Sequence, residues 1–279
     1  MTSPYLISGP ALLSFSGGRT SGYMLRQVLD AHGGKLPDDV YVTFSNTGKE
    51  REETLRFVHD CATHWGVYVH WLEWVAGPAG EPSTYQEVGF NSAARAGEPF
   101  AALIERKGYL PNTVTRFCTM ELKIRVMRDF MRARGYDRWV NIVGLRADEQ
   151  GRVAKAEKRN ASGKERWTTL MPLAAGGVSE RDVLAFWQDQ PFDLGLRGFE
   201  GNCDACFLKG RGKLWEIERN RPGTLQWWID QEAKRTSPFS SRVTYDEIRR
   251  RSQQQPDLYD KFFDADPEMD AECGLWCGD

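Results

Sequence analysis

The residue types best suited to chemistry stand close together near the start of the chain, in a serine- and glycine-rich segment, residues 14–21. The adjacent Gly17 and Gly18 allow a tight backbone turn, and a helix predicted directly after them leaves its first N–H groups unpaired. The positive end of the helix dipole adds to these donors, so we predict a phosphate- or sulfate-binding loop. An ordinary strand-to-helix turn is the alternative. Hydroxyl groups and one cation flank the glycines, on Ser14, Ser16, Arg19, Thr20 and Ser21.

Alternating strands and helices must position this serine–glycine loop. Residues 10–15 form a short apolar run typical of a buried strand, and residues 20–29 carry an apolar stripe at helical spacing. A second strand (40–44), a helix (52–65) and a third strand (67–72) follow. Such alternation predicts an α/β fold with a doubly wound parallel sheet, in which ligands bind at the carboxyl ends of the strands.

The loop resembles the SGGxxS pyrophosphate loop of PP-loop enzymes, in the form found in adenylyl-sulfate and phosphoadenylyl-sulfate reductases. It differs from a Walker loop, because no Gly-Lys-Ser/Thr follows, and from the dinucleotide fingerprint, because the third glycine is missing. The resemblance implies a PP-loop α/β domain over residues 1–195 that binds an adenine nucleotide. A cysteine-containing helical appendage and tail would occupy residues 196–279.

Two further segments match this family. Asn46, Thr47 and Gly48 follow the second strand, where the reductases have an Asp-Thr-Gly-like turn, which implies nucleotide contact. An ordinary turn built on Asn and Gly is the alternative. Arg146 and Arg152 follow a strand predicted at residues 139–143 and resemble the segment that binds the sulfonucleotide; the alternative is solvated loop charges. The charged run after them, residues 155–164, is predicted as an exposed loop.

One C-x-x-C motif, Cys203 and Cys206, could hold zinc, an iron–sulfur cluster or a redox disulfide. Cys118, placed just before a predicted helix, is the obvious third partner. Reductases that contain a cluster carry a Cys-Cys pair there, but Phe117 replaces one member of it. The three-cysteine pattern resembles that of PP-loop sulfur-insertion enzymes instead, and this implies a [4Fe–4S] cluster on Cys118, Cys203 and Cys206. Cys61 falls on the apolar side of a predicted helix and is expected to be a core thiol.

The chain ends in a second cysteine motif. Residues 272–275, Glu-Cys-Gly-Leu, resemble the C-terminal segment in which the reductases keep their nucleophilic cysteine, which implies a catalytic Cys273. Trp276 stands where that family has a histidine, and Cys277 has no counterpart there.

The composition of the chain argues against several classes of protein. The net charge of −2 argues against bulk electrostatic binding to nucleic acid, although a local basic patch is compatible with it. Apolar runs of membrane-spanning length and a signal peptide are both missing, which favours a cytoplasmic protein without membrane contact. Between residues 75 and 115, repeated Gly and Pro break up any long element and predict a lid, a binding loop or a flexible excursion.

Three functions are therefore considered. The first is a thiol-dependent reductase that releases sulfite from adenylyl sulfate or its 3′-phosphate: the arginines hold the sulfate, Cys273 attacks sulfur, and a thioredoxin-like reductant completes turnover. The second is an ATP-dependent PP-loop sulfurtransferase that modifies tRNA or DNA, with the nucleic acid as partner. The third is a nucleotide-binding protein without turnover.

Overall fold

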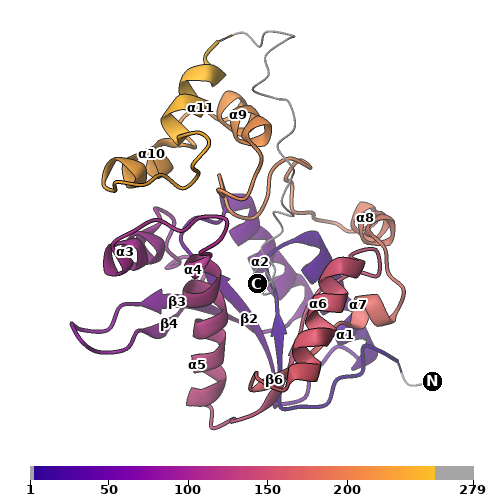
Figure 1. The fold of residues 1–279 in the computed structure, drawn as a ribbon. Coiled ribbons are helices and arrows are strands. Elements are labelled where there is room, and N and C mark those ends of the chain that lie inside the picture. The colour runs from indigo at the N-terminus through magenta and orange to yellow at the C-terminus, as the bar shows by residue number, and fades with distance from the viewer. Residues whose placement is uncertain (1–2, 255–279) are drawn as a thin grey trace.

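A computed structural model describes residues 3–254, and its centre is a six-stranded sheet in the order β4-β3-β2-β1-β5-β6 (Figure 1). β4 pairs antiparallel with β3 at one edge, and every other neighbouring pair of strands is parallel. The predicted α/β fold with a mostly parallel sheet is therefore confirmed. The strands are β1 (Ala11–Ser14), β2 (Val40–Asn46), β3 (Val69–Val75), β4 (Thr84–Val88), β5 (Trp139–Ile142) and β6 (Trp167–Leu170).

The sheet is doubly wound, with one apolar core on each face. Successive residues of β1 alternate between the two cores: Ala11 and Leu13 join one and Leu12 joins the other. Helices α1 (Arg19–Ala31), α2 (Glu52–Trp65) and α8 (Glu180–Gln188) contribute to the first core. The second core is covered by α3 (Glu98–Lys107), a short α4 (Phe117–Thr119), the π-helical η1 (Met120–Arg125), α5 (Val126–Ala133) and α6 (Gln150–Ser162).

Two expectations about irregular segments were wrong. Residues 75–115 contain β4 and α3, whose ends are marked by the same Gly and Pro residues that suggested a loop. Residues 155–164 lie mostly in α6, of which only Ala156 is fully buried. Because nearly the whole surface of α6 meets solvent, its sequence shows no apolar stripe, and helix-forming Lys, Arg, Glu and Ala define it instead.

Three helices follow the α/β unit and gather at one end of the molecule, at the top of Figure 1. They are α9 (Arg211–Asn220), α10 (Gln226–Ala233) and α11 (Tyr245–Ser252). Trp228 stacks on Tyr245 with ring centroids 5.3 Å apart, and Phe239 meets both rings. This aromatic group shares the second core with α3 and η1, which attaches the helical appendage to the sheet. The proposed boundary at residue 195 stays a prediction.

Cys61 lies on α2 and is fully buried, as expected of a core thiol. Burial raises the pKa of the Cys61 thiol far above its ordinary value, because the thiolate would lose its hydration. Within residues 3–254, none of the helices has the length and apolar character needed to span a bilayer.

Candidate functional site: the serine–glycine loop and its neighbours

The serine–glycine loop leaves the centre of the sheet, because β1 pairs with β2 on one side and β5 on the other. Phe15 N–H still donates to the Thr43 carbonyl at 2.9 Å, and the chain then turns. Gly17 has a φ of 78°, and a Cβ there would stand 2.6 Å from the Thr54 methyl group on α2. Glycine is therefore required at this position, and the loop lies directly against α2.

Several backbone N–H groups of the loop have no hydrogen-bond acceptor in the described part of the chain. α1 begins at Arg19 with Gly18 as its N-cap, and glycine has no side chain to accept from the first N–H groups of the helix. Across residues 3–254, no acceptor is found for the backbone N–H groups of Ser16, Gly17, Arg19 and Thr20. Four such donors on one turn, at the positive end of a helix dipole, create a site for an anion.

The serine hydroxyl groups divide into two sets. Ser21 Oγ accepts from Gly18 N–H at 3.3 Å, lies 3.0 Å from the Gly18 carbonyl and lies 3.0 Å from Ser16 Oγ. Its hydroxyl therefore shapes the turn. Ser14 is buried, whereas Ser16 and Thr20 are half-buried and lie nearest to solvent. Ser16 and Thr20 are the hydroxyl groups best placed to meet a ligand.

Arg19 was predicted to offer a cation to the ligand of the loop, but its guanidinium faces Asp193. Nε of Arg19 donates to Asp193 Oδ1 at 2.7 Å, and the same guanidinium donates to the Leu196 carbonyl. Burial on its own raises the pKa of Asp193, but hydrogen bonds, led by those from Arg19, bring it below its ordinary value. The structure thus gives Arg19 the task of anchoring residues 193–196 beside α1.

Arg146, predicted to bind the sulfate or phosphate of a ligand, contacts the loop. It follows β5, and its Nη1 donates to Thr20 Oγ1 at 3.2 Å, while its Nε donates to Asp148 at 2.9 Å. Gly144 permits this approach, because a Cβ there would lie only 3.3 Å from the Ser21 Cα. Arg152 lies in the first turn of α6 and forms an ion pair with Glu149.

The polar side chains of Asn46, at the end of β2, and of Thr47, directly after it, point into the protein. The side-chain nitrogen of Asn46, which is fully buried, donates to Glu73 at 2.6 Å and to the Ala94 carbonyl at 2.9 Å. Asn46 Oδ1 accepts from Gly48 N–H, and both donors of Thr47 go to Glu50 Oε2 at 2.7 and 2.8 Å. These contacts occupy the polar groups of Asn46 and Thr47, so the ordinary-turn interpretation fits better than the predicted contact with a nucleotide.

The C-x-x-C motif is docked on this segment, a relationship the sequence did not indicate. We call residues 202–206 the strap. Arg51 N–H donates to the Asn202 carbonyl at 2.8 Å, and Asp204 N–H donates to the Lys49 carbonyl at 2.9 Å. Asn202 also donates through Nδ2 to the Ser16 carbonyl at 2.9 Å. The strap therefore connects the serine–glycine loop to the end of β2.

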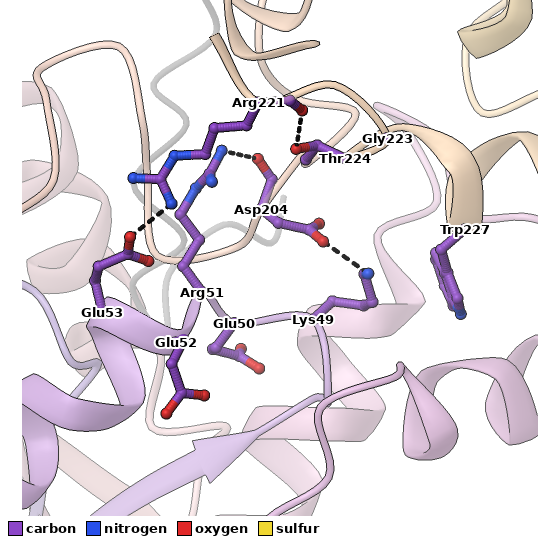
Figure 2. A pocket seen from close by; sticks show the side chains of 10 residues that line it. All are labelled: Lys49, Glu50, Arg51, Glu52, Glu53, Asp204, Arg221, Gly223, Thr224 and Trp227. Carbon is purple, nitrogen blue, oxygen red and sulfur yellow. Dashed lines mark hydrogen bonds and ion pairs between the residues drawn. The ribbon is translucent and has the colours of Figure 1, made fainter.

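A cavity of about 360 Å³ lies beside the strap (Figure 2). Asp204 stands between two cations there: its carboxylate pairs with Lys49 at 2.7 Å, and its carbonyl accepts from Arg51 at 2.9 Å. Burial lowers the pKa of the Arg51 guanidinium, an effect that Glu200 opposes. The mixed charges of the wall suit a polar ligand of low net charge. The lining residues are Lys49, Glu50, Arg51, Glu52, Glu53, Asp204, Arg221, Gly223, Thr224 and Trp227.

The three cysteines assigned to a cluster form no disulfide and lie at the second core, which contains Cys206 and against which Cys118 and Cys203 pack. Cys206 is buried, while Cys118 and Cys203 are half-buried. Among residues 3–254, no group of three or more His, Cys, Asp or Glu side chains is arranged to hold a metal ion. These thiols therefore do not fit a [4Fe–4S] cluster in the arrangement described, and the cluster stays a prediction. The predicted nucleophile Cys273 lies outside the described residues.

Comparison with known proteins identifies a family. No protein-family model matches the chain. An uncharacterized nin region protein, ORF290 of Escherichia phage lambda, is 30% identical over 211 residues, which cover 73% of this chain and 67% of that protein. The chain belongs to the ORF290 family. The chain is also similar to the uncharacterized protein MJ0066 of Methanocaldococcus jannaschii, 24% identical over 225 residues that cover 80% of this chain and 41% of that protein.

Among solved structures, the chain aligns with the U34-tRNA thiolase NcsA of Methanococcus maripaludis, which was solved with its [4Fe–4S] cluster. The alignment covers 86% of this chain and 79% of that one, at 13% identity and a TM-score of 0.31. A TM-score of this size is too low to carry a conclusion about function.

Proposed function

We propose that the protein is an enzyme that binds ATP through the serine–glycine loop and adenylates a substrate, with release of pyrophosphate, ahead of sulfur transfer. The observation that carries this proposal is the set of four loop N–H groups, on Ser16, Gly17, Arg19 and Thr20, that lack an acceptor among the described residues. Two adjoining phosphates offer enough oxygens to accept from all four.

The role of the loop in this reaction follows from where negative charge develops as the bond to pyrophosphate breaks. An oxygen of the substrate attacks the α-phosphorus of ATP, the bond to the bridging oxygen breaks, and pyrophosphate leaves with the electron pair. Preorganised N–H donors in the loop stabilise the negative charge on the leaving group. Arg146, which donates to Thr20 and also pairs with Asp148, adds a guanidinium at the same edge. The adenylated substrate then loses AMP when a sulfur nucleophile takes its place.

The arginines near the loop bear on the choice between ATP and a sulfonucleotide. A reductase needs cations around the sulfate as well as donors for the phosphate, and three arginines were candidates for both tasks. Each of the three also pairs with a carboxylate, Arg19 with Asp193, Arg146 with Asp148 and Arg152 with Glu149, and Arg146 in addition donates to Thr20 on the loop. A tRNA or DNA substrate fits this ATP-dependent reaction as the partner.

A reductase of adenylyl sulfate or its 3′-phosphate is the second candidate, because residues 272–275 match its nucleophile segment. Both candidates require an adenine nucleotide on the loop, and they differ in the product. No step of either reaction is assigned to a cluster, since the described thiols do not form a site for one.

The test uses the full chain with a loop variant, Ser16→Ala combined with Gly18→Ala. Gly18 has a negative φ of −101°, so alanine fits its backbone, while the added Cβ would press on Asn202 at 3.3 Å. The control is Ser162→Ala, an exposed serine at the end of α6. Calorimetry should show nucleotide binding in the wild type and the control but not in the loop variant, with unchanged thermal unfolding in all three.

Product analysis then separates the candidates. Incubation with ATP and a thiolatable RNA or DNA should release pyrophosphate, and incubation with adenylyl sulfate and a dithiol should yield no sulfite. Sulfite without pyrophosphate would favour the reductase. Unchanged affinity of the loop variant for every adenine nucleotide that binds the wild type would refute both.

A further inference from the structure

Helix α6 carries basic side chains on one face. Residues 150–166, which comprise α6 and the turn after it, contain six Lys or Arg and two Asp or Glu, a net charge of +4, whereas the whole chain carries −2. Four of these cations are spaced three or four residues apart and therefore share one face of the helix. They are Arg152, Lys155, Lys158 and Arg159. Glu157, the acidic residue of α6, has no basic residue three or four positions away and belongs to another face.

The two lysines of this face lack a carboxylate partner. Lys155 and Lys158 are exposed, and neither side chain forms an ion pair or a hydrogen bond within residues 3–254. The positions three and four residues from each lysine hold no Asp or Glu, and those around Lys155 include three further cations. Like charges at this spacing destabilise a helix, so a polyanion that neutralises them would stabilise α6.

The basic face begins next to the serine–glycine loop. Arg146, whose Nη1 donates to Thr20 Oγ1 at 3.2 Å, also lies 3.9 Å from the carboxylate of Glu149. Glu149 is the N-cap of α6 and pairs with Arg152, the first basic residue of the face. Because α6 has 13 residues, it extends about 20 Å from this point. The lysines therefore lie along a path that starts at the loop.

The composition of α6 argues against a membrane as the partner. A helix that lies on a bilayer carries large apolar side chains as well as basic ones. Apart from the half-buried Val153, the apolar residues of α6 are alanines, so the helix has no large apolar side chain to insert. A nucleic acid needs no such insertion, because its phosphates bind Lys and Arg at the surface.

We propose that the basic face of α6 binds the phosphate backbone of a nucleic acid and holds it beside the serine–glycine loop. The inference rests on the proposed function, in which a tRNA or DNA is the substrate, and it adds the surface that binds this substrate. Contacts to backbone phosphates do not read sequence. The face should therefore bind single-stranded RNA and single-stranded DNA of the same sequence with similar affinity.

The experiment measures binding of fluorescently labelled single-stranded RNA and DNA to the full chain by anisotropy, over a range of salt concentrations. The variant is Lys155→Gln combined with Lys158→Gln, which removes two exposed charges and keeps good helix formers. Loss of two phosphate contacts should weaken binding about tenfold or more at roughly 0.1 M salt. The slope of log affinity against log salt concentration should become shallower by about 1.4, or about 0.7 for each contact.

The matched control is Lys35→Gln combined with Lys234→Gln. Both lysines are exposed, Lys35 between α1 and β2 and Lys234 at the end of α10, so the control removes the same charge away from α6. Its affinity and salt slope should stay close to those of the wild type. Wild-type affinity and slope in the α6 variant would overturn the proposal, and so would an equal loss in the control.

Two further measurements separate this surface from the ATP site. Calorimetry should show wild-type affinity for ATP in the α6 variant, because neither lysine contacts the loop. If the unaltered chain binds ATP but neither RNA nor DNA, the proposal for α6 is wrong and the ATP site stands. If RNA and DNA binding depends on the two lysines but ATP does not bind, the proposed function is wrong and the α6 surface stands. Binding to vesicles of anionic phospholipid without binding to RNA or DNA would assign the face to a membrane and overturn the proposal.

Discussion

Asn46 donates a hydrogen bond from its side-chain nitrogen to Oε1 of Glu73 at 2.6 Å, and both side chains are buried. Glu73 also accepts from the Ala94 N–H at 2.7 Å and from Gln86 at 3.2 Å. Its partners are thus neutral donors. A carboxylate surrounded in this way tolerates an amide at position 46 and would repel a second carboxylate, so the structure favours Asn over Asp at this position.

Asn46→Asp should therefore destabilise the protein by about 2 kcal/mol near neutral pH, since it replaces a buried hydrogen bond by charge repulsion. The pair would hold a proton more tightly in the folded state than in the unfolded state. The loss in free energy of unfolding relative to the wild type should then be small in mild acid and grow as the pH rises. Denaturant unfolding across pH checks this.

The double variant Asn46→Asp with Glu73→Gln restores one donor and one acceptor and should recover most of the loss. A deficit that is independent of pH, or that persists in the double variant, would contradict the explanation by charge.

How far the sequence could predict this site depends on the sequence distance between partners. The loop and α1 follow from a local pattern of glycines, serines and apolar residues, and Arg146 follows from the end of β5. By contrast, Arg19 meets Asp193 across 174 positions, and Asn202 meets Ser16 across 186. No local periodicity records such contacts, because the tertiary fold decides them.

The strap rests on a buried tyrosine. Tyr245 is 2% exposed, and its hydroxyl donates to the Ala205 carbonyl at 2.6 Å, between the two cysteines of the motif. Tyr245→Phe would leave that carbonyl without its donor and should cost about 1–3 kcal/mol. Tyr109→Phe, at a residue that is 46% exposed, is the control and should change the free energy of unfolding little.

The same contact has a pH signature. Burial raises the pKa of Tyr245 well above its ordinary value. Because the folded state holds this proton more tightly than the unfolded state, the stabilisation is fully present below about pH 10 and declines as the pH rises further. Wild-type stability should fall above that pH more steeply than the stability of Tyr245→Phe. If the free energy of unfolding falls equally steeply with pH in both proteins, Tyr245 is not the source of the pH dependence.

Arg146 and Arg152 should differ in their effect on nucleotide binding. Arg146 contacts Thr20 on the loop, whereas Arg152 pairs with Glu149. Arg146→Gln should weaken ATP binding about tenfold or more, the loss expected for a charge-assisted contact to phosphate. Arg152→Gln should have a smaller effect. Calorimetry on both variants measures the difference, and equal losses would show that the whole Arg146–Arg152 segment acts as one unit.

The iron–sulfur cluster can be tested apart from activity. If Cys118, Cys203 and Cys206 bind one, anaerobically purified protein should contain iron and sulfide, and its visible absorbance should disappear in Cys203→Ser and Cys206→Ser. Cys61→Ala should keep it, because Cys61 is a core thiol on α2. Stoichiometric zinc without iron would reject the cluster and favour a structural metal.

The tail cysteine separates the two candidate reactions. In the proposed ATP-dependent reaction the leaving group is pyrophosphate and the loop supplies the stabilisation, so Cys273→Ser should bind ATP and release pyrophosphate like the wild type. In a reductase, losing the nucleophile removes turnover but leaves substrate contacts made by other groups intact. Cys273→Ser would then bind adenylyl sulfate and form no sulfite and no trapped S-sulfo adduct.

Cys277→Ser is the matched control, since it removes a neighbouring thiol that has no counterpart in the reductase motif. Loss of sulfite formation in Cys273→Ser alone would return the reductase to first place, and unchanged pyrophosphate release in both variants supports adenylation.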